Sequence, residues 1–182
     1  MNYKTGRRIA LIVLVVCVLV SILFGGGRKL EQYRERQLQC FYDGVDGDGL
    51  CIYNDLMVRV TSAHNLLSLS ERYLKPTDEA VTDLQDAITA MDAAVGVGEY
   101  FEANYDLTLA STELYNTMAA QELSEKDERL LSEQFTEMSS RNMTISHDGY
   151  NAVAVEFNSL LSAFPTSLIA AVNGVDRLEE FR

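Results

Sequence analysis

The chain has 182 residues and a formal charge of −12, which is unevenly distributed along it. Residues 1–29 hold five of the 15 basic residues and no acid, whereas residues 30–182 hold all 27 acidic residues and carry a charge of −17. A region this acidic repels phosphate backbones, which argues against nucleic-acid binding. Two prolines, no tryptophan and few β-branched runs after residue 60 predict an all-α fold.

Residues 9–27 form a stretch without charge, IALIVLVVCVLVSILFGGG. As a helix rising ~1.5 Å per residue it would reach about 28 Å, close to the ~30 Å hydrocarbon core of a bilayer. We therefore expect a transmembrane helix at 9–27, preceded by a short basic tail at 1–8 with Tyr3 at the interface. A signal peptide cleaved after the small residues Gly25 and Gly27 is the alternative.

The basic residues that flank this stretch are nearly balanced. Three precede it and four follow it closely, so the positive-inside rule favours neither orientation. These residues are Lys4, Arg7 and Arg8 before the stretch, and Arg28, Lys29, Arg34 and Arg36 after it. We expect a single-pass protein of the cell membrane, and the side on which its larger part lies stays open.

Residues 28–51 are expected to form a short charged juxtamembrane helix that ends in a Gly/Asp-rich loop at 43–49. Cys40 and Cys51 flank the loop. They would form a disulfide in an oxidising compartment, or remain two thiols in a reducing cytosol. The aspartates of the loop suggest a calcium-binding site. If Asp46 is taken as the first position of an EF-hand loop, however, the sixth position is not the required glycine. A solvated acidic turn is therefore expected, with a weak cation site as the alternative.

Apolar residues that recur at steps of three, four and seven predict the next helices. These segments are 52–73, 78–94 and 99–121. Thr77 is the expected N-cap of the second segment. Gly96 and Gly98 interrupt the pattern at a cost of about 2 kcal/mol relative to alanine, so 78–121 is either one kinked helix or two helices.

A longer helix is predicted from its N-cap Ser124 to Phe164-Pro165. Its apolar residues alternate steps of three and four over ~40 residues, a heptad seam typical of a coiled coil. Asn142 and Gly149 lie on this seam and weaken it. Asn142 is interpreted either as a polar residue that fixes helix register or as a solvated residue at the helix edge.

A short apolar helix at 167–172 follows, capped by Thr166 and closed by Asn173-Gly174. Long helices joined by short turns pack antiparallel. We therefore predict that residues 52–182 form an elongated antiparallel bundle of long helices after the N-terminal transmembrane helix.

Three motifs of the C-terminal third resemble the signature of the bacterial LemA family. They are Tyr150-Asn151, Phe157-Asn158 and Phe164-Pro165-Thr166-Ser167-Leu168-Ile169-Ala170. The aromatic residues are seven apart, so we expect them to line one helix face and to enter the core. A looser match covers Asn54-Asp55-Leu56-Met57 and Val60.

The chain also departs from the family pattern. Val58 replaces the usual proline, and His147-Asp148-Gly149 replaces the usual basic pair and acid before Tyr-Asn. The resemblance implies an N-terminal transmembrane helix, a bundle of long antiparallel helices on the cytoplasmic side and no settled molecular role. It also implies that any contact made by those basic residues in relatives is lost in this chain.

Motifs for chemistry are absent from the sequence. His64 and His147 are the only histidines and lack metal-ligand spacing, and no nucleophile motif accompanies the pair His147-Asp148. Gly96-Val97-Gly98 lacks the third glycine of a phosphate-binding loop. We therefore predict that the protein is not an enzyme and has no catalytic, cofactor-binding or metal-binding residue.

The expected function is a non-enzymatic scaffold or interaction role, anchored in the lipid bilayer through residues 9–27. The partner is an unknown protein or a second copy of the chain, and nucleic acid is not expected. The acidic helix faces either dock a basic partner or serve as a solvated surface. The alternative function is an envelope sensor or adaptor that binds a small ligand or cation near residues 43–51.

Overall fold

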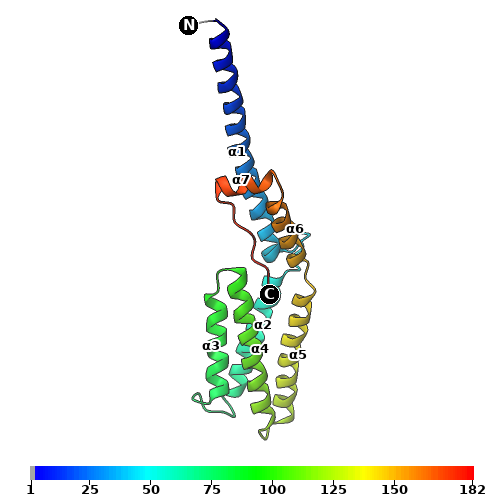
Figure 1. Cartoon of the computed structure of the whole chain (residues 1–182). Helices are drawn as coiled ribbons and strands as arrows, with labels where there is room; N and C mark the ends of the chain where they lie inside the picture. Colours follow the sequence, from blue (N-terminus) through cyan, green and yellow to red (C-terminus); the bar gives the residue numbers. More distant parts are fainter. Residues whose placement is uncertain (1–2) are drawn as a thin grey trace. The chain divides into compact units, whose positions relative to one another are not determined.

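The computed structural model describes the backbone of residues 3–182 and the side chains of residues 6–182, and Figure 1 shows its helices. Within this range the secondary structure consists of α-helices, which confirms the all-α prediction. The helices are α1 (Tyr3–Asp43), α2 (Ile52–Ser70), α3 (Glu79–Ala93), α4 (Val97–Ala119), α5 (Glu125–Ser146), α6 (Tyr150–Ser162) and α7 (Thr166–Asn173). The predicted interfacial side chain of Tyr3, and Met1 and Asn2 of the predicted tail, lie outside the described residues.

The chain divides into two compact units. The first unit comprises the N-terminal part up to Leu38 together with 153–178, and the second comprises 39–152 and 179–182. Residues 153–178, predicted as part of the 52–182 bundle, therefore group with the N-terminal helix.

Helix α1 joins three segments that the sequence treats separately: the basic tail, the apolar stretch at 9–27 and the juxtamembrane helix. It is the one single helix among the described residues that is long and apolar enough to cross a membrane. The large apolar side chains of this stretch are exposed along their length, as expected of a helix whose surroundings are lipid. By length and composition α1 is thus a helix that could span a membrane, which agrees with the position of the predicted anchor.

The first unit packs α6 and α7 against α1. Phe157 of α6 is buried, and its ring centroid lies 5.8 Å from that of Tyr33 in α1. The Arg34 Nε–H donates to the Asp176 carbonyl oxygen at 3.0 Å. These contacts hold α6 and the segment after α7 to the part of α1 that follows the apolar stretch.

A tight contact joins α7 to the end of the apolar stretch. The Asn173 Nδ2–H donates to the Leu23 carbonyl oxygen at 3.0 Å, and Ile169 faces Gly26. A Cβ atom on Gly27 would lie 2.1 to 2.4 Å from the side-chain atoms of Asn173. A side chain at position 27 would therefore displace the Asn173 side chain, and this close approach accounts for the last of the three consecutive glycines.

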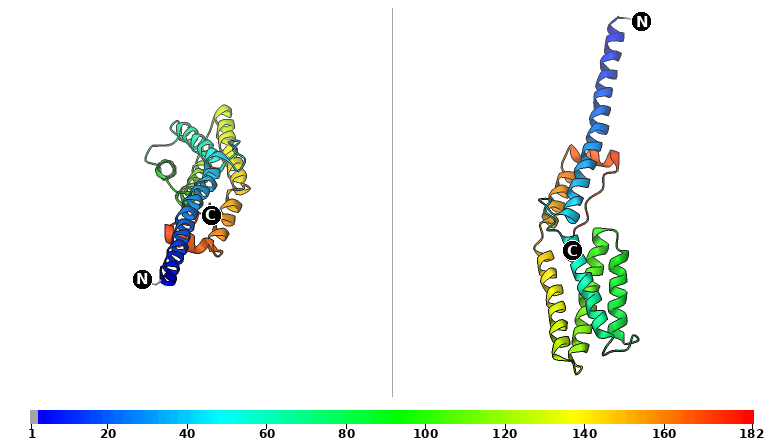
Figure 2. Two further views of the ribbon diagram at one scale, coloured as in Figure 1. Left: turned by 90° about the horizontal axis from the view of Figure 1, so that it is seen from above. Right: turned by 180° about the vertical axis from the view of Figure 1, so that it is seen from behind.

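In the second unit α2 packs on α5 and α3 packs on α4, and Figures 1 and 2 show these four helices side by side. Leucine, isoleucine and methionine side chains fill the space between them. At one end Phe41 is fully buried, with its ring centroid 5.6 Å from Tyr100, 5.4 Å from Tyr150 and 6.0 Å from Phe181. This aromatic cluster ties the last residues of α1 to α4 and to the C-terminus.

Two helix boundaries resolve alternatives left by the sequence. Ala94 to Gly96 separate α3 from α4, so the region 78–121 is two helices.

The N-cap of α3 is Asp78 in extended conformation, which corrects the prediction of Thr77. The Asp78 carboxylate accepts from the Lys75 backbone N–H at 2.8 Å and closes the turn before the helix. The predicted N-cap Ser124 is confirmed, because its Oγ accepts from the Asp127 N–H at 3.2 Å.

The prediction of one long helix from Ser124 to Phe164 is wrong, because α5 ends at Ser146 and α6 begins at Tyr150. Local side-chain hydrogen bonds compete with helix continuation here. The Ser146 Oγ–H donates to the Met143 carbonyl oxygen at 2.7 Å, and the Asp148 carboxylate accepts from the Tyr150 N–H at 2.7 Å. The bond from Tyr150 to Asp148 lies at the beginning of α6. The heptad pattern is therefore interrupted at Gly149, where it was expected to be weak.

Two further predictions at the C-terminal end are corrected. Tyr150 and Phe157 are buried, but Phe164 is 84% exposed and does not enter the core. Pro165 is the N-cap of α7, and the predicted cap Thr166 is its first helical residue. The predicted closure at Gly174 is confirmed by its left-handed backbone, φ 67°.

Candidate functional site

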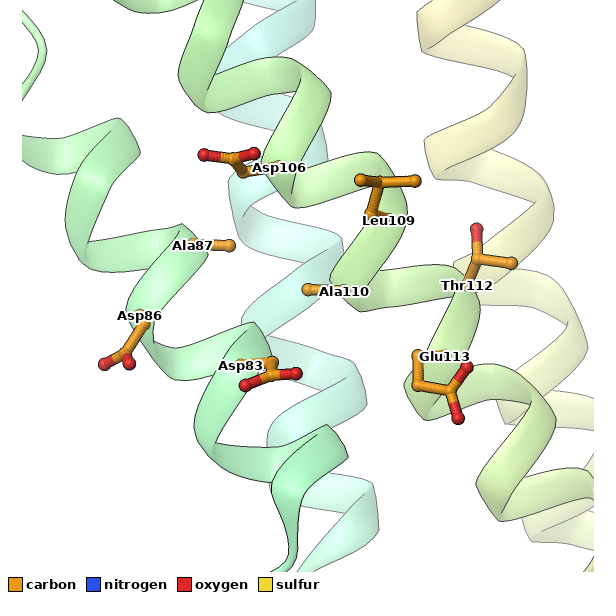
Figure 3. Close-up of a pocket in the computed structure, with 8 residues that line it drawn as sticks. All are labelled: Asp83, Asp86, Ala87, Asp106, Leu109, Ala110, Thr112 and Glu113. Atoms are coloured by element: carbon orange, nitrogen blue, oxygen red, sulfur yellow. The ribbon is translucent and has the colours of Figure 1, made fainter.

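A groove runs over the surface of the second unit between α3 and α4 (Figure 3). Its volume is about 580 Å³. The methyl groups of Ala87 and Ala110 point toward each other at its floor. Its edges carry four exposed carboxylates, those of Asp83, Asp86, Asp106 and Glu113.

Small residues at regular spacing create this groove. Ala80 and Ala87 of α3, and Ala103 and Ala110 of α4, are buried and lie seven residues apart within each helix. Because the distance between two packed helices depends on the side chains at their contact, alanines bring the backbones close together. The longer acidic side chains then rise on both sides of a shallow apolar floor.

The groove lies in the most acidic part of the molecule. Helices α3 and α4 each contain four acidic residues and no basic one. No lysine or arginine occurs in the sequence between Lys75 and Lys126. Uncompensated carboxylates gathered over one groove produce a negative potential that attracts cationic groups from solution.

A second hollow continues the groove toward the N-terminal end of α4. Its volume is about 550 Å³, and it shares Asp106 with the first groove. Glu99, Glu102 and Glu179 contribute further carboxylates to its lining. The Glu179 carboxylate accepts from the Gly98 backbone N–H at 3.0 Å, which fixes the C-terminal segment at this end of α4. The two hollows make one acidic strip along α4.

A separate polar cluster lies inside the second unit around Arg59, which is 1% exposed. Its Nη1 donates to the side-chain oxygens of Asn104 and of Asn142, the latter at 2.7 Å, and its Nη2 donates to Thr108 Oγ1 at 2.7 Å. Burial lowers the pKa of Arg59 to about 10. The guanidinium therefore links α2, α4 and α5 through neutral partners.

The cluster decides how Asn142 is interpreted. Asn142 is half-buried and also accepts from the Asn104 Nδ2–H at 3.2 Å, so it takes part in packing between helices. This contact favours the role of a register-fixing residue over that of a solvated residue at the helix edge.

Arg59 itself was missed by the sequence interpretation. The available signal was a charged residue inside a helix whose neighbouring positions Leu56 and Val60 are apolar.

The loop at 43–49 lines a third pocket, of about 550 Å³. Helices α2 and α5 and the turn after α5 complete it with Asp55, Arg141, His147 and Asp148. The Arg141 Nη1–H donates to Asp55 at 3.1 Å, and its Nε–H donates to Glu137 at 2.7 Å. Burial, and secondarily the charge of Asp55, raises the pKa of Asp148.

Two carboxylates at the loop bond to groups close to them in the sequence. The Asp48 carboxylate accepts from the Leu50 N–H at 3.0 Å, and the Asp43 carboxylate accepts from Gln39 at 2.8 Å. Gly44 has φ 88°, and a Cβ there would lie 2.6 Å from the Leu50 carbonyl oxygen. Among the residues with described side chains, no group of three His, Cys, Asp or Glu is arranged to hold a metal ion.

The remaining candidates from the sequence lie apart from one another. His64 is exposed on α2. The His147 Nδ1 lies 2.9 Å from the Met143 carbonyl oxygen and 3.1 Å from Ser146 Oγ, while Asp148 bonds to backbone, so the pair is not arranged as a dyad. Cys51 is a buried thiol whose Sγ–H donates to the Tyr42 carbonyl oxygen at 3.0 Å, so it forms no disulfide in this structure.

No protein-family model, no curated protein and no solved structure matches the chain. The resemblance to the LemA family therefore stays a prediction that rests on the motifs of residues 150–170.

Proposed function

We propose that the protein is a membrane-anchored, non-enzymatic interaction protein of the LemA type. Helix α1 anchors it in the cell membrane as a single span. Helices α2 to α5 form an antiparallel bundle that presents the acidic groove of α3 and α4 to a basic segment of a partner protein. The observation that carries the proposal is the base-free groove lined by Asp83, Asp86, Asp106 and Glu113.

The anchor is supported by the composition and exposure of α1. Residues 9–27 are uncharged, and their large apolar side chains have no protein surface to pack against over most of this length. Transferring such side chains from water to lipid is favourable by roughly 25 cal/mol per Å² of apolar surface. The family resemblance favours the cytoplasmic side for the rest of the chain, whereas the flanking basic residues favour neither side.

The groove suits lysine and arginine side chains. Its alanine floor accepts their apolar stems, and Leu109, which is exposed at the rim, adds an apolar contact. Carboxylates on both sides meet the charged ends. Such charge complementarity raises the association rate and makes binding weaken as salt increases, because exposed charges are screened within ~8 Å at physiological ionic strength.

A charge-neutral variant of the groove tests this proposal. The full chain in lipid nanodiscs is titrated with a fluorescent peptide of alternating lysine and alanine, and anisotropy is read at several salt concentrations. The variant D83N/D86N/D106N/E113Q is compared with E122Q/E125Q/E128Q/E133Q, which removes the same charge from exposed positions on or near α5. We expect the groove variant to weaken binding at least tenfold more than the control. Equal weakening in the two variants contradicts a groove-specific site.

A second function is favoured by the pocket beside the loop at 43–49. Its lining combines the carboxylates of Asp46, Asp48 and Asp55 with the guanidinium of Arg141. We propose as the alternative that this pocket takes a small ligand or cation and that the protein acts as an envelope sensor or adaptor. Calorimetry of the full chain with calcium and magnesium tests the cation. No heat, and no change in melting temperature, contradicts it.

A further inference from the structure

Residues 157–175 contain no charged side chain, and they are as long as the apolar stretch at 9–27. They include the end of α6, all of α7 and the connection between them. Several of their large apolar side chains are exposed. Phe164 is 84% exposed, Leu168 51% and Val172 48%. Besides the apolar stretch at 9–27, the chain therefore carries a second uncharged segment with exposed apolar side chains.

Helix α7 has two distinct faces. Ile169 and Asn173, four residues apart, face α1, where they meet Gly26 and Gly27. Leu168 and Val172, also four residues apart, lie on a different face and are exposed. Phe164 lies in the connection just before the N-cap Pro165 and is exposed as well. We call Phe164, Leu168 and Val172 the α7 apolar face.

The contact with α1 fixes where this face lies along the apolar stretch. Asn173 is bonded to the Leu23 carbonyl oxygen, so α7 touches α1 at residues 23–27, the end of the uncharged stretch. Arg28 and Lys29 follow directly. Both views of the first unit show α7 lying across α1 at this level (Figures 1 and 2). If residues 9–27 span the bilayer, α7 lies at the boundary between hydrocarbon and headgroups.

We propose that the α7 apolar face is a second membrane contact, which rests on the lipid interface of the same bilayer that α1 crosses. Helices that lie in the membrane interface bind at this depth through the burial of their apolar face. The inference rests on the proposed anchoring by α1. The lipid interface is the occupant favoured over a protein partner, because the contact with α1 places this face at the end of the span.

Site-directed spin labels test the proposal in the full chain in phosphatidylcholine–phosphatidylglycerol nanodiscs. Single cysteines are introduced as Phe164→Cys, Leu168→Cys and Val172→Cys in a background with the native cysteines replaced. Val13→Cys reports on the span, and Val95→Cys, at an exposed site of the second unit, reports on water. Collision rates with oxygen, which concentrates in lipid, and with a water-soluble nickel chelate are measured at each site.

We expect the ratio of oxygen to nickel collisions at 164, 168 and 172 to exceed the ratio at 95 at least threefold, and to stay below that at 13. Water-like ratios on α7 with a lipid-like ratio at 13 overturn the α7 contact and leave the anchor intact. A water-like ratio at 13 overturns both. Labels on α7 that are shielded from both reagents overturn the lipid contact in favour of a protein partner or a second copy.

Discussion

Asn158 holds Leu178 by both atoms of its side-chain amide. Its Oδ1 accepts from the Leu178 N–H at 2.9 Å, and its Nδ2–H donates to the Leu178 carbonyl oxygen at 2.9 Å. Asn151 makes the same pair of bonds to Phe181, at 2.7 and 3.0 Å. Each asparagine follows a buried aromatic residue, so the repeated aromatic–Asn motif fixes a C-terminal segment that has no regular secondary structure.

We expect Asn158→Ala to destabilise the first unit by about 2 kcal/mol, because two hydrogen bonds worth ~1 kcal/mol each are lost. Cleavage by trypsin after Arg177 should become several times faster in the full chain in detergent. Ser159→Ala, at an exposed neighbouring position, is the control and should change neither quantity. Unchanged cleavage in Asn158→Ala would show that the amide does not hold this segment.

Replacement of Arg59 should reveal a buried network. Arg59→Met removes a charge but leaves the Asn104 oxygen without its donor, whereas the Asn142 oxygen keeps only its bond from Asn104. An unpaired buried polar group costs about 1–3 kcal/mol. We expect a loss of roughly 3 kcal/mol in Arg59→Met, measured by thermal unfolding followed by circular dichroism. The triple variant with Asn104→Leu and Asn142→Leu should recover a large part of it, because neighbouring changes in one network are not additive. Additive losses would argue against the network.

Asp148→Asn should stabilise the second unit at neutral pH. Because burial raises the pKa of Asp148 above its usual value in the folded state, the folded chain binds more protons than the unfolded chain just above pH 3.8. Stability therefore falls as pH rises through this window, and the charged carboxylate is unfavourable at pH 7. Asparagine keeps the acceptor oxygen for the Tyr150 N–H. The melting temperature of the variant should exceed that of the parent at pH 7 and approach it below pH 3.8.

Gly25 and Gly27 form a matched pair for testing the contact between α1 and α7. A Cβ on Gly25 has nothing within 4 Å, so Gly25→Ala should gain up to about 1 kcal/mol from helix propensity. Gly27→Ala has the same propensity gain but displaces the Asn173 side chain from its bonds to Leu23 and Ile169. We expect hydrogen exchange of α7 to be faster in Gly27→Ala and unchanged in Gly25→Ala. Equal exchange in both variants contradicts the contact.

Most helices could be predicted from the sequence, because periodic apolar residues and the residues that begin or end a helix act locally. Ser124 and Gly174 marked helix ends correctly, and the glycines near residue 96 marked a separation. The prediction of a single helix through residue 149 was wrong, since a regular heptad pattern continued across it. The side-chain hydrogen bonds of Ser146 and Asp148 that end α5 and start α6 are short-range effects that periodicity does not contain.

The candidate sites were less accessible from the sequence, because they depend on which helices become neighbours. The abundance of acidic residues was evident, but the groove requires Ala87 to face Ala110 across two helices. Arg59 was missed because its partners lie 45 to 83 residues away. The loop at 43–49 was identified from its composition, whereas the contribution of Arg141 to the same pocket came from packing of α5 on α2.

Tethering to the membrane by an uncleaved α1 is the central claim, and alkaline carbonate extraction with mass analysis tests it most directly. Membranes from cells that express the full chain are washed at high pH, and the mass of the chain is measured in pellet and supernatant. We predict that the chain stays in the pellet at its full mass of 20.3 kDa. Recovery in the supernatant, or a mass reduced by removal of residues up to Gly27, would contradict the claim.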